Sequence, residues 1–300
     1  MHINRTILCA TYLLGGLAAA LSCKPALADP LPFTWNPNGA TVPLGSPGNA
    51  IVNANNYSVS DFSSISINTT TGAFTEVGAL NVLNFLNGGN TVASPGLGLA
   101  SGSSAAYSLY LAFTASGFQG AIPTVNGTST NGQFTSLSYQ LIGTTAGAPP
   151  LAFAVSNGSV VTTDPGTKIV LAYGNLVPNT GFVTLTKTAN GYSPTANVNL
   201  TFNECLAAGG PGGCTANESG FFVSPLSGLS LQIGNFSATD SVTSLNTPGG
   251  NTSYLNLNGG SGNLTFATTA VPEPATLAVF SIALLGLGAV ARRRMNSQAL

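Results

Sequence analysis

Few residues between positions 29 and 270 could perform acid–base or nucleophilic chemistry. This stretch contains no histidine and no arginine, since the one histidine of the chain is His2. That composition excludes a Ser-His-Asp triad, a histidine-ligated metal and a guanidinium clamp for an anionic substrate. A glycosidase-type carboxylate pair stays open, but no known motif surrounds any acid, so we expect no catalytic residue, metal or cofactor. The carboxylates are Asp29, Asp61, Glu76, Asp164, Glu204, Glu218 and Asp240.

The same stretch carries very little charge. Lys168 and Lys187 are its two basic residues, and against seven acids they leave a formal charge of −5. Nucleic-acid binding requires many Lys and Arg side chains to displace counterions from phosphates, so we predict no nucleic-acid partner. Gly, Ser, Thr and Asn dominate instead. Such a surface suits a neutral polysaccharide, and it is equally typical of any weakly charged secreted β protein.

The last thirty residues, 271–300, consist of three parts. In order they are Pro272-Glu273-Pro274, the apolar and uncharged residues 275–291, and Arg292-Arg293-Arg294. As a helix, the 17 apolar residues span about 25 Å, the low end for crossing a bilayer. Arginines directly after such a span stay on the cytoplasmic side. We therefore predict one C-terminal transmembrane helix here rather than a buried core helix.

This tail resembles the PEP-CTERM sorting signal of exported bacterial proteins. Pro272, Glu273 and Pro274 match its motif residue for residue. The resemblance implies that an integral-membrane exosortase recognises the motif, cleaves near it and passes the protein to the cell surface or extracellular matrix, in hosts that usually make exopolysaccharide. Two prolines flanking one residue favour an extended backbone, which suits the cleft of a processing enzyme.

Residues 1–28 have the three parts of a secretory signal peptide. Arg5 supplies the positive region, residues 7–21 are mostly apolar, and Ala26 and Ala28 frame an A-x-A cleavage site. We predict that signal peptidase removes this segment. Both ends of the chain then begin in the cytoplasm, and the body between them is exported.

Cys205 and Cys214 are the two cysteines that remain after signal-peptide removal, and they flank a glycine-rich loop. Two cysteines without histidine cannot complete a zinc shell, and a catalytic redox pair is normally C-x-x-C. In an oxidising compartment they are expected to form a disulfide.

As an alternative to signal-peptidase cleavage, Cys23 could accept a lipid, but the residues before it match a lipobox poorly.

Short runs with a period of two, separated by Gly, Asn and Pro, predict strands throughout the body. The stretch 80–86 is left open between strand and short helix, and 160–172 predicts a hairpin around Asp164-Pro165-Gly166. The remaining expected strands are 62–68, 105–116, 134–142, 151–156, 182–187, 198–203, 229–236, 254–257 and 263–268.

Turn signals every 8 to 15 residues are typical of a sandwich. We therefore expect an all-β, antiparallel β-sandwich-like body at residues 57–270. A Pro-rich extended segment at 29–56 should lead into it. Its Trp35, the one tryptophan of the chain, is expected to pack on the sheet rather than to stack on a sugar.

The body also looks like flocculation-associated PEP-CTERM proteins, although no binding residue can be carried over from them. The segments that carry this resemblance are Tyr-Ser-Leu-Tyr-Leu-Ala-Phe at 107–113, Phe134-Thr135, Asn-Leu-Thr-Phe-Asn at 199–203, Phe221-Phe222 and Gly-Asn-Leu-Thr-Phe at 262–266. The resemblance implies a structural or adhesive role in an exopolysaccharide-associated biofilm or floc, with exopolysaccharide or like copies as partners.

Two other functions remain open. A glycan-binding module of the cell surface predicts either exposed aromatic side chains gathered on one sheet face or a calcium site. A secreted hydrolase predicts at least two acids that face each other across a cleft.

Overall fold

The computed structural model is all-β, as predicted, and residues 30–268 form one compact unit. It describes residues 32–44, 51–98, 107–145, 151–164, 166–224, 229–237, 242–246 and 250–268. The strands are β1 Phe33–Trp35, β2 Ile51–Ala54, β3 Asn56–Asn68, β4 Ala73–Asn87, β5 Asn90–Val92, β6 Tyr107–Gln119, β7 Ser129–Thr145, β8 Ala152–Ser156, β9 Ser159–Thr163, β10 Lys168–Asn175, β11 Phe182–Thr188, β12 Gly191–Thr201, β13 Asn203–Glu204, β14 Phe222–Ser224, β15 Leu229–Ser237, β16 Val242–Asn246 and β17 Thr252–Thr268; η1 is a short 3-10 turn at Pro211–Gly213.

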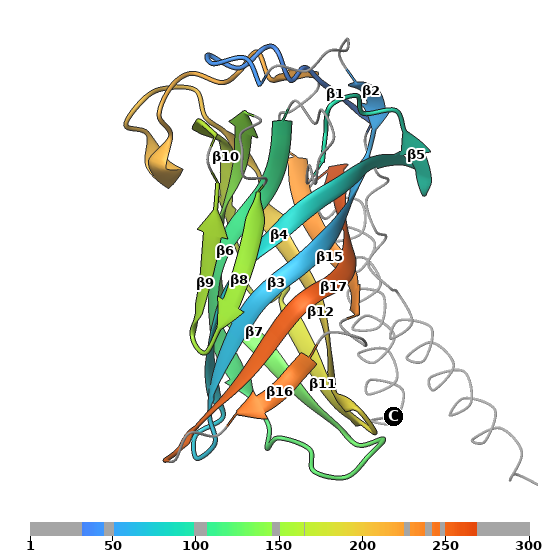
Figure 1. The fold of residues 1–300 in the computed structure, drawn as a ribbon, viewed down its shortest axis with the longest axis vertical. Coiled ribbons are helices and arrows are strands. Elements are labelled where there is room, and N and C mark those ends of the chain that lie inside the picture. The colour runs from blue at the N-terminus through green and yellow to red at the C-terminus, as the bar shows by residue number, and fades with distance from the viewer. Residues whose placement is uncertain are drawn as a thin grey trace, which may run out of the picture. The chain divides into compact units, whose positions relative to one another are not determined.

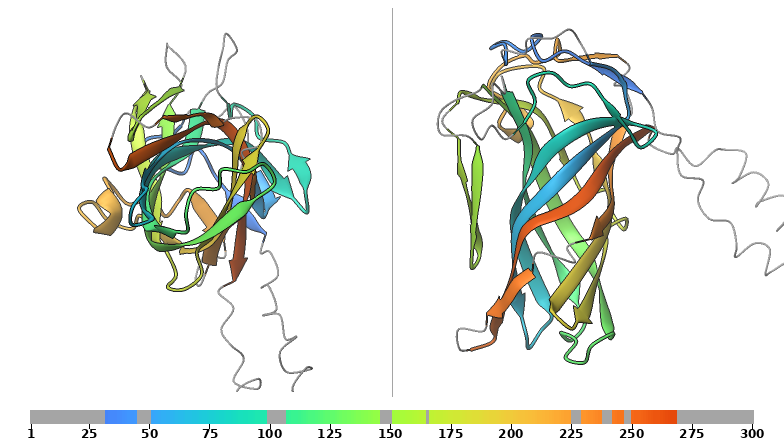
Figure 2. Two further views of the ribbon diagram at one scale, coloured as in Figure 1. Left: turned by 90° about the horizontal axis from the view of Figure 1, so that it is seen from below. Right: turned by 45° about the vertical axis from the view of Figure 1, so that its right-hand side comes forward.

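One large antiparallel sheet closes on itself. Its strands follow the order β11-β12-β15-β17-β3-β4-β6-β7, and pairing of β11 with β7 completes the ring. We call this closed sheet the cylinder; Figure 1 shows it from the side and Figure 2 from below. Successive side chains of a strand alternate between its interior and its outer face. A closed ring of eight strands is just wide enough for side chains to fill it or to enclose one small ligand.

The expected sandwich of two facing sheets is therefore wrong. The strands are longer than predicted, with 15 residues in β4 and 17 in β7. Bulges at Ser58/Val59 and Ser116/Gly117 increase the local twist, which allows one sheet to curl until its edges meet. Both architectures bury every second residue, so the alternation in the sequence does not distinguish them.

The long strand β7 is shared by two neighbours. Its residues 138–144 pair with β10, and its residues 129–133 pair with β11. β10 and β11 thus occupy successive parts of one position in the ring. On the outer face of the sheet, β7 is therefore flanked by β10 at residues 138–144 and by β11 at residues 129–133.

The strands predicted at β6 and β7 are confirmed, including which residues face inward. Tyr107, Leu109 and Leu111 of β6 are buried in the interior, as are Leu137 and Tyr139 of β7. The ambiguous stretch 80–86 is strand, because it continues β4, and the two short runs at 254–257 and 263–268 belong to the single strand β17.

The predicted hairpin at 160–172 is wrong. Its first half, β9, pairs with β8, whereas its second half, β10, pairs with β7 and β13. The turn that forms the hairpin is Asn157-Gly158, with Gly158 at φ 76°. Asn-Gly is the strongest short hairpin signal, and it took precedence over the Asp-Pro-Gly sequence downstream.

Aromatic side chains fill one end of the cylinder beneath the small sheet β14-β1-β2. Trp35 of β1 is fully buried, and its ring centroid lies 3.6–6.4 Å from those of Tyr57, Phe85, Phe221 and Phe222. The prediction that Trp35 packs against the sheet is confirmed. Large buried rings of this kind contribute most of the stability of a β core.

The signal peptide at 1–28 and the anchor at 271–300 lie outside the described residues. Within the described part of the chain, no helix is long and apolar enough to span a membrane.

Candidate functional site

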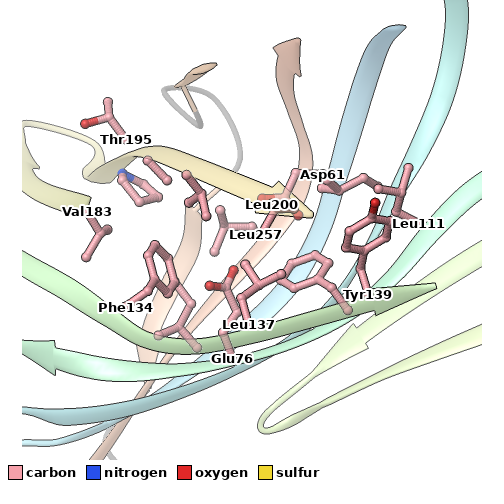
Figure 3. Close-up of a pocket in the computed structure, with 16 residues that line it drawn as sticks. Asp61, Glu76, Leu111, Phe134, Leu137, Tyr139, Val183, Thr195, Leu200 and Leu257 are labelled. Carbon is pink, nitrogen blue, oxygen red and sulfur yellow. The ribbon is translucent and has the colours of Figure 1, made fainter. Parts of the chain in front are cut away.

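A cavity of about 60 Å³ lies inside the cylinder, and two acids line it. Figure 3 shows Asp61 of β3 and Glu76 of β4 among apolar neighbours such as Leu111, Phe134 and Leu257. Asp61 is 4% exposed and Glu76 is 9% exposed. We call this space the interior cavity. It is the place where the body holds two of its carboxyls together in apolar surroundings.

The strand register explains how the two acids share one wall. Ser63 lies opposite Gly78, and this row separates the row of Asp61 from the row of Glu76. A Cβ at Gly78 would lie 2.4 Å from the ring of Phe113 and 2.7 Å from the Cβ of Ser63. Glycine is therefore required here, because the Phe113 ring of β6 covers the backbone at this row.

Burial raises the pKa of both carboxyls. Desolvation raises the pKa of Glu76 from 4.5 to about 7, opposed by hydrogen bonding from Ser63. Desolvation also raises the pKa of Asp61 well above its ordinary value, and the nearby Glu76 carboxylate raises it further. Asp61 Oδ2 accepts a hydrogen bond from Ser63 Oγ at 3.4 Å, whereas its buried Oδ1 has no partner among the described residues.

The two acids differ in arrangement from the catalytic pair that a hydrolase requires. Asp61 and Glu76 lie on neighbouring strands of one wall, paired with Leu80 and Ile65 respectively, so they do not face each other across a cleft. The interior cavity has room for a few water molecules, whereas pockets for small-molecule ligands measure about 300–1,000 Å³. A polysaccharide cannot reach these carboxyls in this geometry.

The other described acids lie apart from this pair. Glu218 is fully buried, and its Oε2 accepts a hydrogen bond from the backbone N–H of Thr41 at 2.7 Å. Asp164 Oδ1 accepts one from the N–H of Gly166 in the turn before β10. Partial burial raises the pKa of Glu204, on β13, to about 7. These three acids lie in separate parts of the fold. Among the described residues, Asp61 and Glu76 are therefore the two acids that line one cavity together.

Hydroxyl pairs run along the outer face of β6 and β7. Thr114 Oγ1 lies 3.1 Å from Ser138 Oγ, and Ser116 Oγ lies 2.8 Å from Ser136 Oγ. Each pair joins residues that are opposite each other in the strand register. Cross-strand pairs of this kind contribute to the stability of a sheet and leave hydroxyl lone pairs facing solvent.

An aromatic rung crosses the same face at one end of these hydroxyl pairs. Phe118 of β6 and Phe182 of β11 both pair with Gln133 of β7, so the three side chains stand in one row. Phe118 is 58% exposed and Phe182 is 56% exposed. Among the described side chains these are the two aromatic residues that are more than half exposed, and they occur on one sheet face.

A groove of about 580 Å³ borders the other end of the hydroxyl pairs. The β8–β9 hairpin, which stands beside the cylinder in Figure 2, supplies one wall through Val160 and Thr162. Tyr173 of β10 and the turn η1 supply the other wall. A Cβ at Gly212 would lie 2.1 Å from the Tyr173 ring, so this glycine, at φ 78°, lets the η1 backbone rest on the ring.

The predicted disulfide is confirmed. Cys205 and Cys214 are bridged across nine positions, with their Cα atoms 5.4 Å apart. The bridge closes the loop that contains η1, and Gln140 Nε2 donates a hydrogen bond to the carbonyl oxygen of Gly212 at 2.6 Å. The disulfide therefore fixes one wall of the groove against the outer face of the sheet.

The remaining predicted site residues lie outside the described residues. These are the cleavage-site residues Ala26 and Ala28, the motif Pro272-Glu273-Pro274 and the basic residues Arg292, Arg293 and Arg294. Comparison with known families nevertheless tests the tail. Residues 270–294 match the family model described as the PEP-CTERM protein-sorting motif.

The chain carries a PEP-CTERM sorting motif. This finding confirms the resemblance seen in the tail and supports an exported, surface-directed protein that an exosortase sorts. The match covers the PEP-CTERM segment alone. No curated protein and no solved structure matches the chain.

Proposed function

We propose that this PEP-CTERM protein is a non-enzymatic structural or adhesive component of an exopolysaccharide matrix, in a biofilm or floc. In this proposal, signal peptidase removes residues 1–28, and residues 275–291 anchor the protein in the membrane until an exosortase acts at Pro272-Glu273-Pro274. The protein then stays at the cell surface or in the matrix, where it contacts polysaccharide or neighbouring copies.

The observation that carries the proposal is the uncharged polar outer surface of an exported protein. Of the five body acids that the structure describes, Asp61, Glu76 and Glu218 are buried, so the surface is even less charged than the composition indicates. Hydroxyl and amide side chains form hydrogen-bonded pairs on the outer face of β6, β7 and β11, on both sides of the aromatic rung. Such groups exchange hydrogen bonds with sugar hydroxyls one weak contact at a time, so many copies must act together.

The arrangement of the acids supports a non-enzymatic role. A glycosidase needs a proton donor and a nucleophile or base on opposite sides of the scissile bond. Asp61 and Glu76 share one wall of a cavity that is too small for a sugar ring, and the described body has no histidine to replace either of them.

Fractionating the host's extracellular material tests this proposal. We expect most of the processed protein to remain with the exopolysaccharide in about 1 M salt, where the Debye length is only about 3 Å, because the contacts are uncharged. Enzymatic digestion of the polysaccharide should then release it. Recovery of the protein chiefly in the medium, or its release by salt alone, would contradict a matrix role.

A further inference from the structure

We propose that a linear neutral polysaccharide binds along the outer face of β6 and β7, in a strip that begins at Phe118 and Phe182 and ends in the groove beside Tyr173. This inference rests on the proposed matrix function and names the surface that performs it. We call this surface the outer strip.

The strand register makes the outer strip continuous. Four successive rungs of the sheet contribute outward-facing side chains to it, from the aromatic end to the groove. In order, these rungs are Phe118–Gln133–Phe182, Ser116–Ser136, Thr114–Ser138–Asn175 and Gln140–Tyr173. From Gln133 to Gln140 the strip is about 23 Å long at about 3.3 Å per residue, long enough for several linked sugars.

The aromatic end suits the apolar faces of sugar rings. Phe118 and Phe182 lie on two strands separated by β7, so their backbones are about 10 Å apart. The two rings therefore stand side by side across the strip, rather than one after the other along it, and together they form an apolar platform at its end. More than half of each side chain is exposed, whereas the other described aromatic side chains are buried or only partly exposed. Gln133 between them offers both hydrogen-bond donors and acceptors.

The middle and the far end of the strip suit sugar hydroxyls. The paired hydroxyls of Thr114 and Ser138 lie on the exposed sheet and border the groove. The groove volume of about 580 Å³ falls within the range of small-ligand sites. Its Tyr173 combines an apolar ring with a polar hydroxyl, so the side chain can contact apolar groups at one end and water or sugar hydroxyls at the other.

The occupant should be neutral because the strip contains no charged side chain. An anionic polymer gains most of its affinity from Arg or Lys contacts, and a nucleic acid requires several of them. Lys168 and Lys187, the two lysines of the body, are not among the residues of the strip. A neutral, hydroxyl-rich polysaccharide does not need Arg or Lys contacts and can exchange hydrogen bonds along the full length of the strip.

The experiment compares variants of the exported protein purified from its host, using the neutral fraction of the host's exopolysaccharide as probe and alginate as an anionic comparison. Phe118→Ala with Phe182→Ala should weaken binding to the neutral fraction at least about ten-fold, since truncated aromatic anchors commonly cost that much. Thr114→Val with Ser138→Ala tests the hydroxyl rung with almost no change in volume. The matched control, Leu83→Ala with Val223→Ala, truncates two exposed apolar side chains outside the strip.

Each outcome decides between claims. Binding that is lost in both strip variants and kept in the control supports the assignment, once thermal unfolding shows that the variants are folded. Wild-type binding that both strip variants retain overturns the strip but leaves the matrix function standing. Failure of the wild-type protein to bind the neutral fraction overturns both. If the wild-type protein binds alginate more strongly than the neutral fraction, the proposal of a neutral occupant is overturned. If the wild-type protein self-associates in the absence of polysaccharide and the strip variants do not, the strip binds a second copy of the chain instead.

Discussion

Replacing Glu76 with glutamine is expected to stabilise the folded body at pH 8 and to leave its stability nearly unchanged at pH 4. Burial raises the pKa of Glu76 from 4.5 to about 7. Between these values the unfolded chain has released the proton and the folded protein still binds it, so the free energy of unfolding falls as the pH rises. At about 1.4 kcal/mol per pKa unit, the loss amounts to about 3 kcal/mol, which the neutral amide avoids.

Urea unfolding of the wild type and the variant at both pH values measures this difference. Asp61→Asn should act in the same direction, since its pKa is also raised by burial. Glu204→Gln should act in the same direction but more weakly, because the carboxyl of Glu204, whose pKa burial also raises, is only partly buried and solvent screens it. If Glu76→Gln instead destabilised the protein more at pH 8 than at pH 4, the buried carboxylate would have an ionic partner, and our account of the interior cavity would be wrong.

Replacing Pro272, Glu273 and Pro274 together with alanine is expected to abolish release of the processed protein in the native host. These residues lie within the matched sorting motif, directly before the apolar span. Without the motif the exosortase has no extended recognition segment, so the chain should keep its tail and stay in the membrane. Immunoblots of membrane and extracellular fractions should then show one larger, membrane-bound species.

The matched control replaces Asn296, Ser297 and Gln298 with alanine. These residues belong to the same tail but lie beyond the matched range of 270–294. Release of that variant should be normal. Normal size and release of the motif variant would show that processing does not depend on Pro272-Glu273-Pro274.

The strands were predictable because each depends on local alternation, whereas the architecture depends on contacts far apart in the sequence. The inward side chains of β6 could be named from their spacing of two. The pairing of β7 with β11, which closes the ring, joins residues up to 57 positions apart, as in the contact between Ser129 and Thr186. No local pattern specifies such a pairing, and this is why a sandwich was expected in place of one closed sheet.

The interior acid pair could have been found from the sequence in part. Ser63, Ile65 and Ile67 alternate on one face, and two residues before Ser63 the same period places Asp61 on that face. Its proximity to Glu76 depends on the register between β3 and β4, which the sequence does not reveal. The outer strip is a similar case, because Phe182 joins the row of Phe118 and Gln133 only when β11 pairs with β7.

Cell aggregation of a strain that lacks this gene tests whether the protein is a structural or adhesive component of the matrix. A structural or adhesive matrix protein should be dispensable for growth and for polysaccharide synthesis, while its loss should weaken aggregation because many linked contacts disappear together. The full-length gene should restore aggregation, and a gene that ends before Pro272 should restore it poorly. A deletion strain that aggregates like the wild type while losing a hydrolytic activity would contradict the account and favour an enzyme.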